Sequence, residues 1–179
     1  MLTYIYPNIY VLGINTYFLN QGNYFVYFIQ FFTGTFLHAG FLHLFLNSIF
    51  IYYFGNIIEA LIGRKKFTLF FIFSTVFIGL IITNYSYNSI PVNTVGISGF
   101  AMALLTFYTL ELKRRNNPEY KGGITALVIN IGIGLLPQIS LLGHLFGAIA
   151  GLIFYLINRD YLRKKLIGLI VGNTEKIPT

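Results

Sequence analysis

Charged side chains are confined to three short parts of this chain, and this confinement limits its possible folds more than any other feature. Residues 1–58, 67–110 and 122–158 contain no Asp, Glu, Lys or Arg. Charged residues make up 9% of the sequence and hydrophobic residues 56%, whereas about a quarter of the residues of an ordinary soluble domain are charged. Long uncharged apolar runs are typical of helices that cross a lipid bilayer. The sequence therefore predicts an all-α, polytopic transmembrane bundle.

The positions of the basic residues indicate the topology of that bundle. The net charge is +7, which could suggest binding to nucleic acid. The basic residues, however, alternate with the apolar runs, as cytoplasmic loops do under the positive-inside rule. We therefore expect a lipid bilayer, and no nucleic acid, as a partner. The clusters are Arg64, Lys65 and Lys66; Lys113, Arg114, Arg115 and Lys121; and Arg159, Arg163, Lys164, Lys165 and Lys176.

Five spanning helices follow from the apolar runs and from the turns between them. We predict them at about residues 40–61, 67–84, 95–112, 123–136 and 139–158. Each is near the ~20 residues that a spanning helix needs, although the fourth is short. Pro91 and the pair Pro137-Gln138 break the chain in the outer loops. Residues near 40, 95 and 139 then share the outer side, and the basic clusters share the inner side.

The N-terminal segment allows two interpretations. Residues 5–19 are apolar but few, and Pro7, Asn8 and Asn15 interrupt them. They form either a short sixth span or an interfacial segment, and residues 20–23 (Asn-Gln-Gly-Asn) are typical of a turn.

Three parts of the chain follow from this reading. They are an N-terminal apolar segment and loop (1–36), a helical core (37–158) and a basic cytoplasmic tail (159–179). Within the tail, residues from Ile167 onward are expected to be loosely ordered.

Four polar side chains lie at a similar depth in the predicted spans. Ser98 lies about one turn inside the outer end of its helix, and His144 about five residues inside the last span. His43 and Asn47 lie in the first span, also near its outer end. At ~1.5 Å per residue, all four fall within roughly 5–13 Å of the outer face. Because ionisable and amide groups are costly inside a membrane, the group indicates a functional site.

This group of side chains predicts nucleophilic catalysis. The Ser98 hydroxyl can attack a carbonyl, and His144 can accept its proton and later protonate the leaving amine. His43 and Asn47 are four residues apart and share a helix face. Their N–H groups, with the backbone N–H of Ser98, can stabilise an oxyanion. No Asp or Glu lies near the outer side, so we predict a Ser–His dyad.

Small residues on two of the spans predict that these helices touch. Gly143, Gly147 and Gly151 form a small-xxx-small ridge on the last span, and Gly99 and Ala103 form another below Ser98. Ridges of this kind let helix backbones approach closely in membranes. If the two ridges face each other, Ser98 and His144 meet.

Each of these residues also has a structural interpretation. Ser98 alone could be a packing residue that bonds its own helix, and His144 alone could be a buried histidine that bonds a carbonyl. Asn47 could join two helices, and His38 and His43 could anchor a helix end or, with His144, bind a metal. Three histidines without a carboxylate or cysteine make a poor metal site. The shared depth favours the dyad, and we expect no metal and no cofactor.

Four motifs, taken in order, closely resemble those of the rhomboid family of intramembrane serine proteases. The resemblance covers residues 33–158. Each motif alone is weak, whereas all four at this spacing are specific. The motifs are His38-xxxx-His43-xxx-Asn47, Glu59-xxx-Gly63-xxx-Phe67, Gly96-Ile97-Ser98-Gly99 and Gly143-His144-xx-Gly147-xxx-Gly151.

The resemblance implies a rhomboid-like bundle that cleaves the transmembrane helix of another membrane protein. It also implies a multi-pass protein of the bacterial inner (plasma) membrane, with its active site toward the outer side. The implied catalytic residues are Ser98 as nucleophile and His144 as general base, with Asn47 and His43 stabilising the oxyanion. The implied supporting residues are His38, the motif glycines Gly96, Gly99, Gly143 and Gly147, and Glu59 as a structural residue.

The N-terminal part departs from the family pattern. Bacterial members usually begin with a complete transmembrane helix and a sizeable loop before the first histidine, whereas residues 20–36 here resemble only the end of that loop. By the same analogy, the fourth span and residues 135–142 form a lateral gate and a cap. The alternative function is a catalytically inactive rhomboid-like protein that binds membrane proteins or acts in their quality control.

Overall fold

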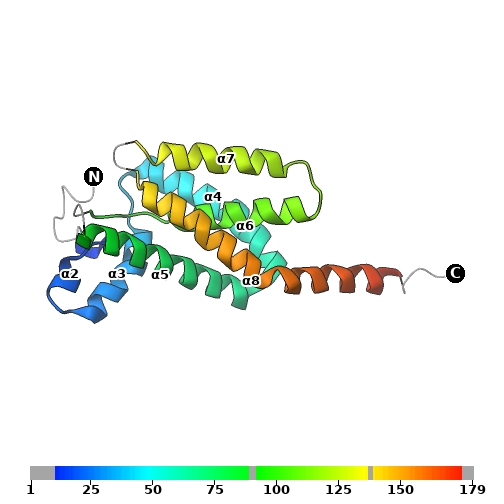
Figure 1. Ribbon diagram of the computed structural model, residues 1–179, viewed down its shortest axis with the longest axis horizontal. Coiled ribbons are helices and arrows are strands. Elements are labelled where there is room, and N and C mark those ends of the chain that lie inside the picture. Colours follow the sequence, from blue (N-terminus) through cyan, green and yellow to red (C-terminus); the bar gives the residue numbers. More distant parts are fainter. Residues whose placement is uncertain (1–10, 89–91, 137–138, 175–179) are drawn as a thin grey trace.

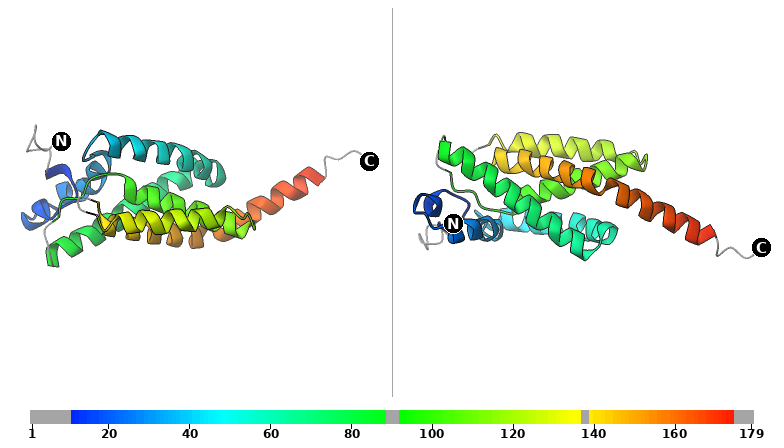
Figure 2. Two further views of the ribbon diagram at one scale, coloured as in Figure 1. Left: turned by 90° about the horizontal axis from the view of Figure 1, so that it is seen from above. Right: turned by 60° about the horizontal axis from the view of Figure 1, so that its bottom comes forward.

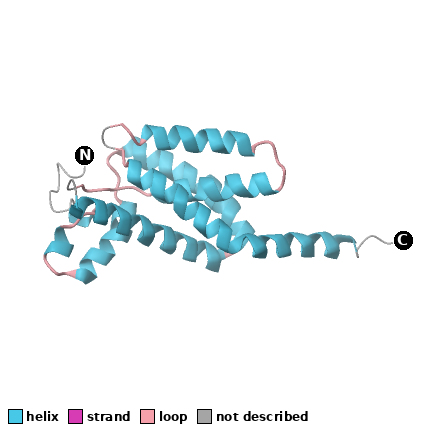
Figure 3. Cartoon of the chain, viewed as in Figure 1, coloured by secondary structure: helices cyan, strands magenta, loops and turns pink. Residues whose placement is uncertain are grey.

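The computed structural model describes residues 11–88, 92–136 and 139–174, with side chains described as far as Lys164. All its regular structure in these ranges is helical (Figure 3). An isolated antiparallel bridge joins Ile14 to Thr94. The predicted all-α fold is therefore confirmed. The helices are α2 (Tyr17–Asn20), α3 (Tyr24–Phe36), α4 (Phe41–Ile62), α5 (Arg64–Asn88), α6 (Ser98–Arg114), α7 (Tyr120–Ile133) and α8 (Leu141–Thr174).

Helix α6 is the centre of the bundle (Figure 1). It packs against α4, α5, α7 and α8, and most of its residues are buried. Aromatic rings from α5 and α8 fill the core beside it, where Phe70 stacks on Phe154 with ring centroids 4.3 Å apart. Because α6 is enclosed by its neighbours, the position of its first residue, Ser98, is fixed by the packing of the whole bundle.

The five predicted spans correspond to α4 through α8. Three segments are long and apolar enough to cross a membrane: Phe41–Ile62, Arg64–Asn88 and Leu141–Lys164. Helix α7 is a shorter apolar helix, and none of its residues Tyr120–Ile133 is buried. The helices therefore have the lengths and the composition of a multi-pass membrane protein.

Several helix ends differ from the prediction; α5, for example, runs from Arg64 to Asn88 rather than over residues 67–84. Helix α6 begins at Ser98, not about one turn earlier, because Gly96 has a positive φ of 110° that a helix cannot contain. Helix α7 ends at Ile133 rather than at residue 136. Helix α8 continues to Thr174 and projects beyond the bundle (Figure 2), so the expectation of loose order from Ile167 was wrong as far as Thr174. Apolar residues continue at helical spacing there, which favours helix over coil.

The described part of the N-terminal segment contains no spanning helix. Residues 11–19 hold only a short helical turn and the start of α2. The predicted turn at 20–23 is present: Gly22 has a φ of 71°, and the Asn23 side chain caps α3 by accepting from the Val26 N–H at 3.2 Å. Residues 1–10, Pro91 and the pair Pro137-Gln138 lie outside the described residues.

A buried carboxylate at the basic end of α6 holds two arginines. Glu111 is 2% exposed and accepts from Arg114 at 2.6 and 2.8 Å and from Arg115 at 2.7 Å. Because Arg114 and Arg115 are three and four residues away, they lie on the same helix face as the carboxylate. The pairing satisfies a charge that would otherwise be costly to bury.

We expect Glu111→Gln to lower the free energy of unfolding by about 2–3 kcal/mol, because it removes the partner of two partly buried guanidinium groups. Glu119→Gln is the matched control, since Glu119 is exposed. Thermal or denaturant unfolding of both variants in detergent measures the difference. Equal stability of the two variants would contradict the structural role of Glu111.

Candidate active site

The turn before α6 requires glycine at position 96. The Gly96 N–H donates to the Gly34 carbonyl at 2.9 Å, and its φ of 110° disfavours any residue with a Cβ. A Cβ there would also lie 2.6 Å from Cε1 of His43, 3.0 Å from its Nε2 and 3.7 Å from Nδ2 of Asn47. The side chains of His43 and Asn47, both from α4, therefore lie against the backbone just before Ser98.

Helices α6 and α8 touch through their backbones. A Cβ at Gly147 would overlap the carbonyl of Gly99, and a Cβ at Gly151 would overlap the carbonyl of Ala103. A Cβ at Gly99 would lie 3.1 Å from the Gly143 carbonyl oxygen. The two predicted small-residue ridges therefore face each other, which brings the first turn of α6 against the first turns of α8.

His144 is oriented by a backbone carbonyl. Its Nδ1 lies 2.7 Å from the carbonyl oxygen of Asn130 on α7, and His144 itself is buried. A carbonyl oxygen can only accept, so Nδ1 carries the proton of this bond. In the neutral imidazole Nε2 is then unprotonated and can accept a proton.

The end of α7 leaves that carbonyl available. The N–H of Gly134 bonds the Ile131 carbonyl at 3.0 Å, three residues back, instead of the Asn130 carbonyl four residues back. At the start of α8, the Ser140 side chain accepts from the Gly143 N–H at 3.0 Å, and the Ser140 carbonyl accepts from the His144 N–H at 3.0 Å. Ser140 is thus the N-cap that fixes the turn carrying His144.

Asn47 has a free donor. It is 8% exposed, and its Nδ2 is buried without a hydrogen-bond partner among the described residues. An unpaired buried amide costs about 1–3 kcal/mol, so its position beside Gly96 needs an explanation outside stability.

His38 lies beside His43, with ring centroids 5.0 Å apart in an edge-to-face arrangement. Its Nδ1 lies 3.2 Å from the Phe36 carbonyl oxygen. Among the described residues, no three His, Asp or Glu side chains are grouped so that they could hold a metal ion.

The structure brings the predicted residues together at one end of the bundle, but the described residues include no hydrogen bond between Ser98 and His144. In a site without substrate such bonds are often long and tighten only when substrate binds. A cavity of about 20 Å³, with room for one water molecule, lies beside Ser98. Thr35, Thr75 and Ser140 line it, and the Thr75 hydroxyl is buried without a hydrogen-bond partner among the residues described.

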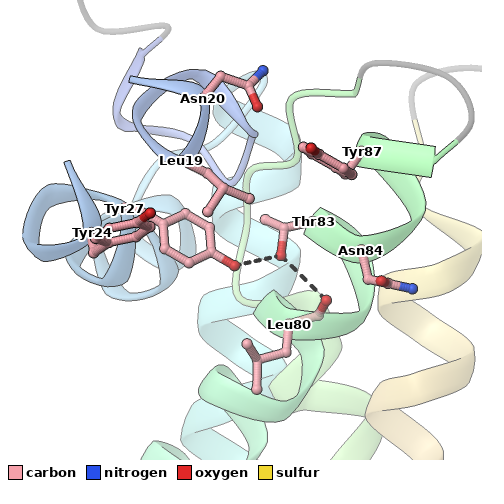
Figure 4. A pocket seen from close by; sticks show the side chains of 8 residues that line it. All are labelled: Leu19, Asn20, Tyr24, Tyr27, Leu80, Thr83, Asn84 and Tyr87. Atoms are coloured by element: carbon pink, nitrogen blue, oxygen red, sulfur yellow. Dashed lines mark hydrogen bonds between the residues drawn. The ribbon is translucent and has the colours of Figure 1, made fainter. Parts of the chain in front are cut away.

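A wider pocket lies elsewhere, between α2–α3 and the end of α5 (Figure 4). It has a volume of about 690 Å³, and the Tyr27 hydroxyl and Thr83 Oγ1 are 2.8 Å apart in its wall. Its lining residues include three tyrosines and two asparagines but no His, Asp, Glu, Lys or Arg. We assign no catalytic role to it because it contains no general acid or base.

Two features of the site were missed by sequence reasoning. The N-cap role of Ser140 could have been found, since serine directly before an apolar helix is a common cap. The role of Asn130 could not, because a backbone carbonyl leaves no signal in the residue type. Glu59, interpreted from the sequence as structural, accepts from the Arg64 side chain at 3.2 Å. Gly63, the residue after the end of α4, lies between them and has a positive φ of 82°.

Comparison with known proteins identifies the family. The family model of the rhomboid domain matches residues 26–160. "Putative rhomboid protease YdcA" of Bacillus subtilis (strain 168) is 31% identical over 126 residues, which cover 66% of this chain and 61% of that relative. The chain thus matches about three fifths of the length of this relative.

Proposed function

The chain belongs to the rhomboid family, and from this we propose that it is an intramembrane serine endopeptidase with Ser98 and His144 as its dyad. In the first step the Ser98 hydroxyl oxygen bonds the substrate carbonyl carbon while His144 Nε2 takes the hydroxyl proton. The imidazolium then protonates the leaving amine as the peptide bond breaks. Water, deprotonated by His144, hydrolyses the acyl-enzyme and restores the serine.

The observation that carries this proposal is the backbone contact between α6 and α8. The contact of Gly147 with Gly99 sets the helix ends bearing Ser98 and His144 against each other. Gly147 cannot carry a side chain without separating them, because its Cβ would overlap the Gly99 carbonyl. Close backbone contacts of this kind are a common way to pack membrane helices. This one supports the dyad because it lies in the turns next to Ser98 and His144.

The tautomer of His144 also supports a base role. The carbonyl of Asn130 takes the part that a carboxylate takes in a triad, because it holds the Nδ1 proton and leaves Nε2 free. The carbonyl is uncharged, so it stabilises the imidazolium less than a carboxylate would. We therefore expect a slower enzyme than a triad protease of similar geometry.

Donors for the oxyanion are the second chemical requirement. The unpaired Nδ2 of Asn47 and the ring of His43 lie beside Gly96, two residues before the serine. The backbone N–H of Ser98, at the first position of α6, lacks an intrahelical partner. Preorganised donors of this kind lower the barrier because they need no rearrangement when negative charge develops.

The proposed substrate is a transmembrane helix of another membrane protein. A helix hides its backbone, so cleavage requires local unwinding, and we expect small residues at the cut and helix-breaking residues nearby. The family resemblance assigns the role of lateral gate to α7. Two features of α7 support this role: it packs against α6 and α8, and none of its residues is buried. We place the enzyme in the bacterial plasma membrane with its site toward the outer side, opposite the basic clusters.

Covalent labelling by a fluorophosphonate tests the dyad and the oxyanion donor together. We expect the wild-type chain to be labelled at Ser98. His144→Ala should slow labelling by about 10²–10⁴-fold because it removes the base, and Asn47→Ala by about 10²–10³-fold because it removes one donor. The rate of labelling, with the site identified by mass spectrometry, is the measurement.

The same experiment separates the alternative function. A chain that binds membrane proteins without cleaving them would show no labelling at Ser98, or labelling at a rate that His144→Ala leaves unchanged. Either result, obtained with folded protein, would contradict the protease proposal. Asn56→Ala is the control for Asn47→Ala, because its amide is exposed and bonds only the Tyr52 carbonyl of its own helix at 2.7 Å.

A further inference from the structure

The segment that leads into Ser98 is held by the N-terminal part of the chain. Ile14 and Thr94 exchange two backbone hydrogen bonds, of 2.8 and 3.0 Å. Two residues later, the Gly96 N–H bonds the Gly34 carbonyl on α3 at 2.9 Å. Residues 92–97 contain no helix, so contacts with other segments determine where this strand-like stretch runs.

Three carboxamides reinforce this pairing, and we call Asn15, Gln30 and Asn93 the amide cluster. The Asn15 Nδ2 donates to Asn93 Oδ1 at 2.8 Å and to the Gly13 carbonyl at 2.9 Å. The Asn15 Oδ1 accepts from the Tyr17 N–H at 2.9 Å and from Gln30 Nε2 at 3.2 Å. Gln30 Nε2 also bonds the Val11 carbonyl. Asn15 therefore uses both ends of its amide.

Burial and close packing distinguish this cluster from a surface contact. Asn15 is 7% exposed and Gln30 is 1% exposed. A Cβ at Gly34 would lie 2.7 Å from Cγ1 of Ile14, and a Cβ at Gly13 would lie 2.5 Å from Oδ1 of Asn93. The segments meet without space for an added methyl group. The hydrogen bonds of the cluster offset most of the cost of enclosing these polar side chains, and Gln30 Oε1 is buried without a partner among the described residues.

The direction of each hydrogen bond makes the cluster specific. Within the part of the chain that the structure describes, the Asn93 side chain contributes only its Oδ1 as an acceptor, whereas Asn15 must donate to Asn93 and accept from Gln30. An aspartate in place of Asn93 would keep the acceptor. An aspartate in place of Asn15 would lose the donated bonds and set one of its oxygens against two other oxygens.

We propose that the amide cluster is a positioning device for catalysis, with Asn15 as its key residue: it fixes the path of residues 93–97 and so the place of the Ser98 hydroxyl and backbone N–H. This inference rests on the proposed protease function. Residues 11–16 and α3 thereby support the site although no spanning helix occurs among residues 11–36. Displacing a reacting group by about 1 Å can cost about a hundredfold in rate.

Isosteric and truncated variants test the proposal through the rate of Ser98 labelling by a fluorophosphonate. We expect Asn15→Asp and Asn93→Ala to lower the second-order rate constant about ten- to a hundredfold. Asn93→Asp should react at nearly the wild-type rate. Asn88→Ala is the control, because among the described residues its amide bonds only Asn84 of its own helix, and it should also react at the wild-type rate.

The extent of labelling separates positioning from folding. The end point counts the molecules that are folded and competent, whereas the rate constant reports the geometry of each such molecule. A purely structural role for Asn15 predicts a lower end point with an unchanged rate constant. Positioning predicts a lower rate constant and a lower kcat at unchanged KM toward a transmembrane substrate.

Different results would overturn the positioning role of Asn15 and the protease function. Unchanged rate constants in both Asn15→Asp and Asn93→Ala would overturn the positioning role, as would an Asn93→Asp variant as slow as Asn93→Ala. These results leave the protease function standing because the wild-type chain is labelled. Should Asn15→Asp fail to fold, Asn93→Ala and Asn93→Asp still form the required pair. An unlabelled wild-type chain would instead overturn the protease proposal and this inference with it.

Discussion

Ser98→Ala is expected to abolish cleavage of a reporter protein with one transmembrane helix, with a fall in rate of at least about a thousandfold. The alanine side chain has no oxygen to form the acyl-enzyme. The neighbouring Ser140 hydroxyl is not expected to replace it as nucleophile, because it caps α8 by accepting from the Gly143 N–H. Cleavage would be measured in reconstituted vesicles by separation of the two product fragments.

Stability should hardly change in this variant. The Ser98 hydroxyl makes no hydrogen bond among the described residues, so its removal leaves no buried partner unpaired. Ser48→Ala is the matched control, because Ser48 is exposed and bonds the Leu44 carbonyl of its own helix at 2.8 Å. Undiminished cleavage by a folded Ser98→Ala protein would refute the assignment of the nucleophile.

Gly147→Ala should be the most damaging small substitution in the helical core. Its Cβ would overlap the Gly99 carbonyl, and helix backbones cannot yield as the end of a flexible side chain can. We expect the free energy of unfolding to fall by about 2–3 kcal/mol. We also expect labelling of Ser98 to slow by about a hundredfold or more, because the two helix ends are pushed apart.

The control for this variant is a Gly→Ala change for which the opposite effect on stability is expected. Gly122, on α7, has open space where a Cβ would be added, so Gly122→Ala should be neutral or stabilise by up to about 1 kcal/mol through helix propensity. Unfolding in detergent and the labelling rate are measured for both. If Gly147→Ala behaved like Gly122→Ala, the backbone contact between α6 and α8 would not exist.

The helices were predictable because their signals are local. Uncharged runs, basic clusters and turn residues define α4 through α8 to within a few residues at most ends. The start of α6 was misplaced by about a turn, since the positive φ of Gly96 is a property of the folded backbone. The length of α8 was underestimated because a basic stretch outside the apolar run was interpreted as a tail.

The site was only partly predictable, for a different reason. Ser98, His43, Asn47 and His144 have side chains whose chemistry is costly in a membrane, and their types reveal them. The partner of His144 is a main-chain oxygen and the path into Ser98 depends on Asn15, which in sequence reads only as an interruption of an apolar run. Their roles depend on contacts between segments far apart in the chain.

The bond between His144 and Asn130 has one more consequence, because the acceptor belongs to α7. That helix has no buried residue of its own, so of the five long helices it is the one that a lipid or an incoming helix could move at least cost. A shift of even 1–2 Å would break the 2.7 Å bond and free the imidazole to rotate and to change its tautomer. In the proposed mechanism, displacement of α7 would therefore leave Ser98 without an oriented base until the helix returned.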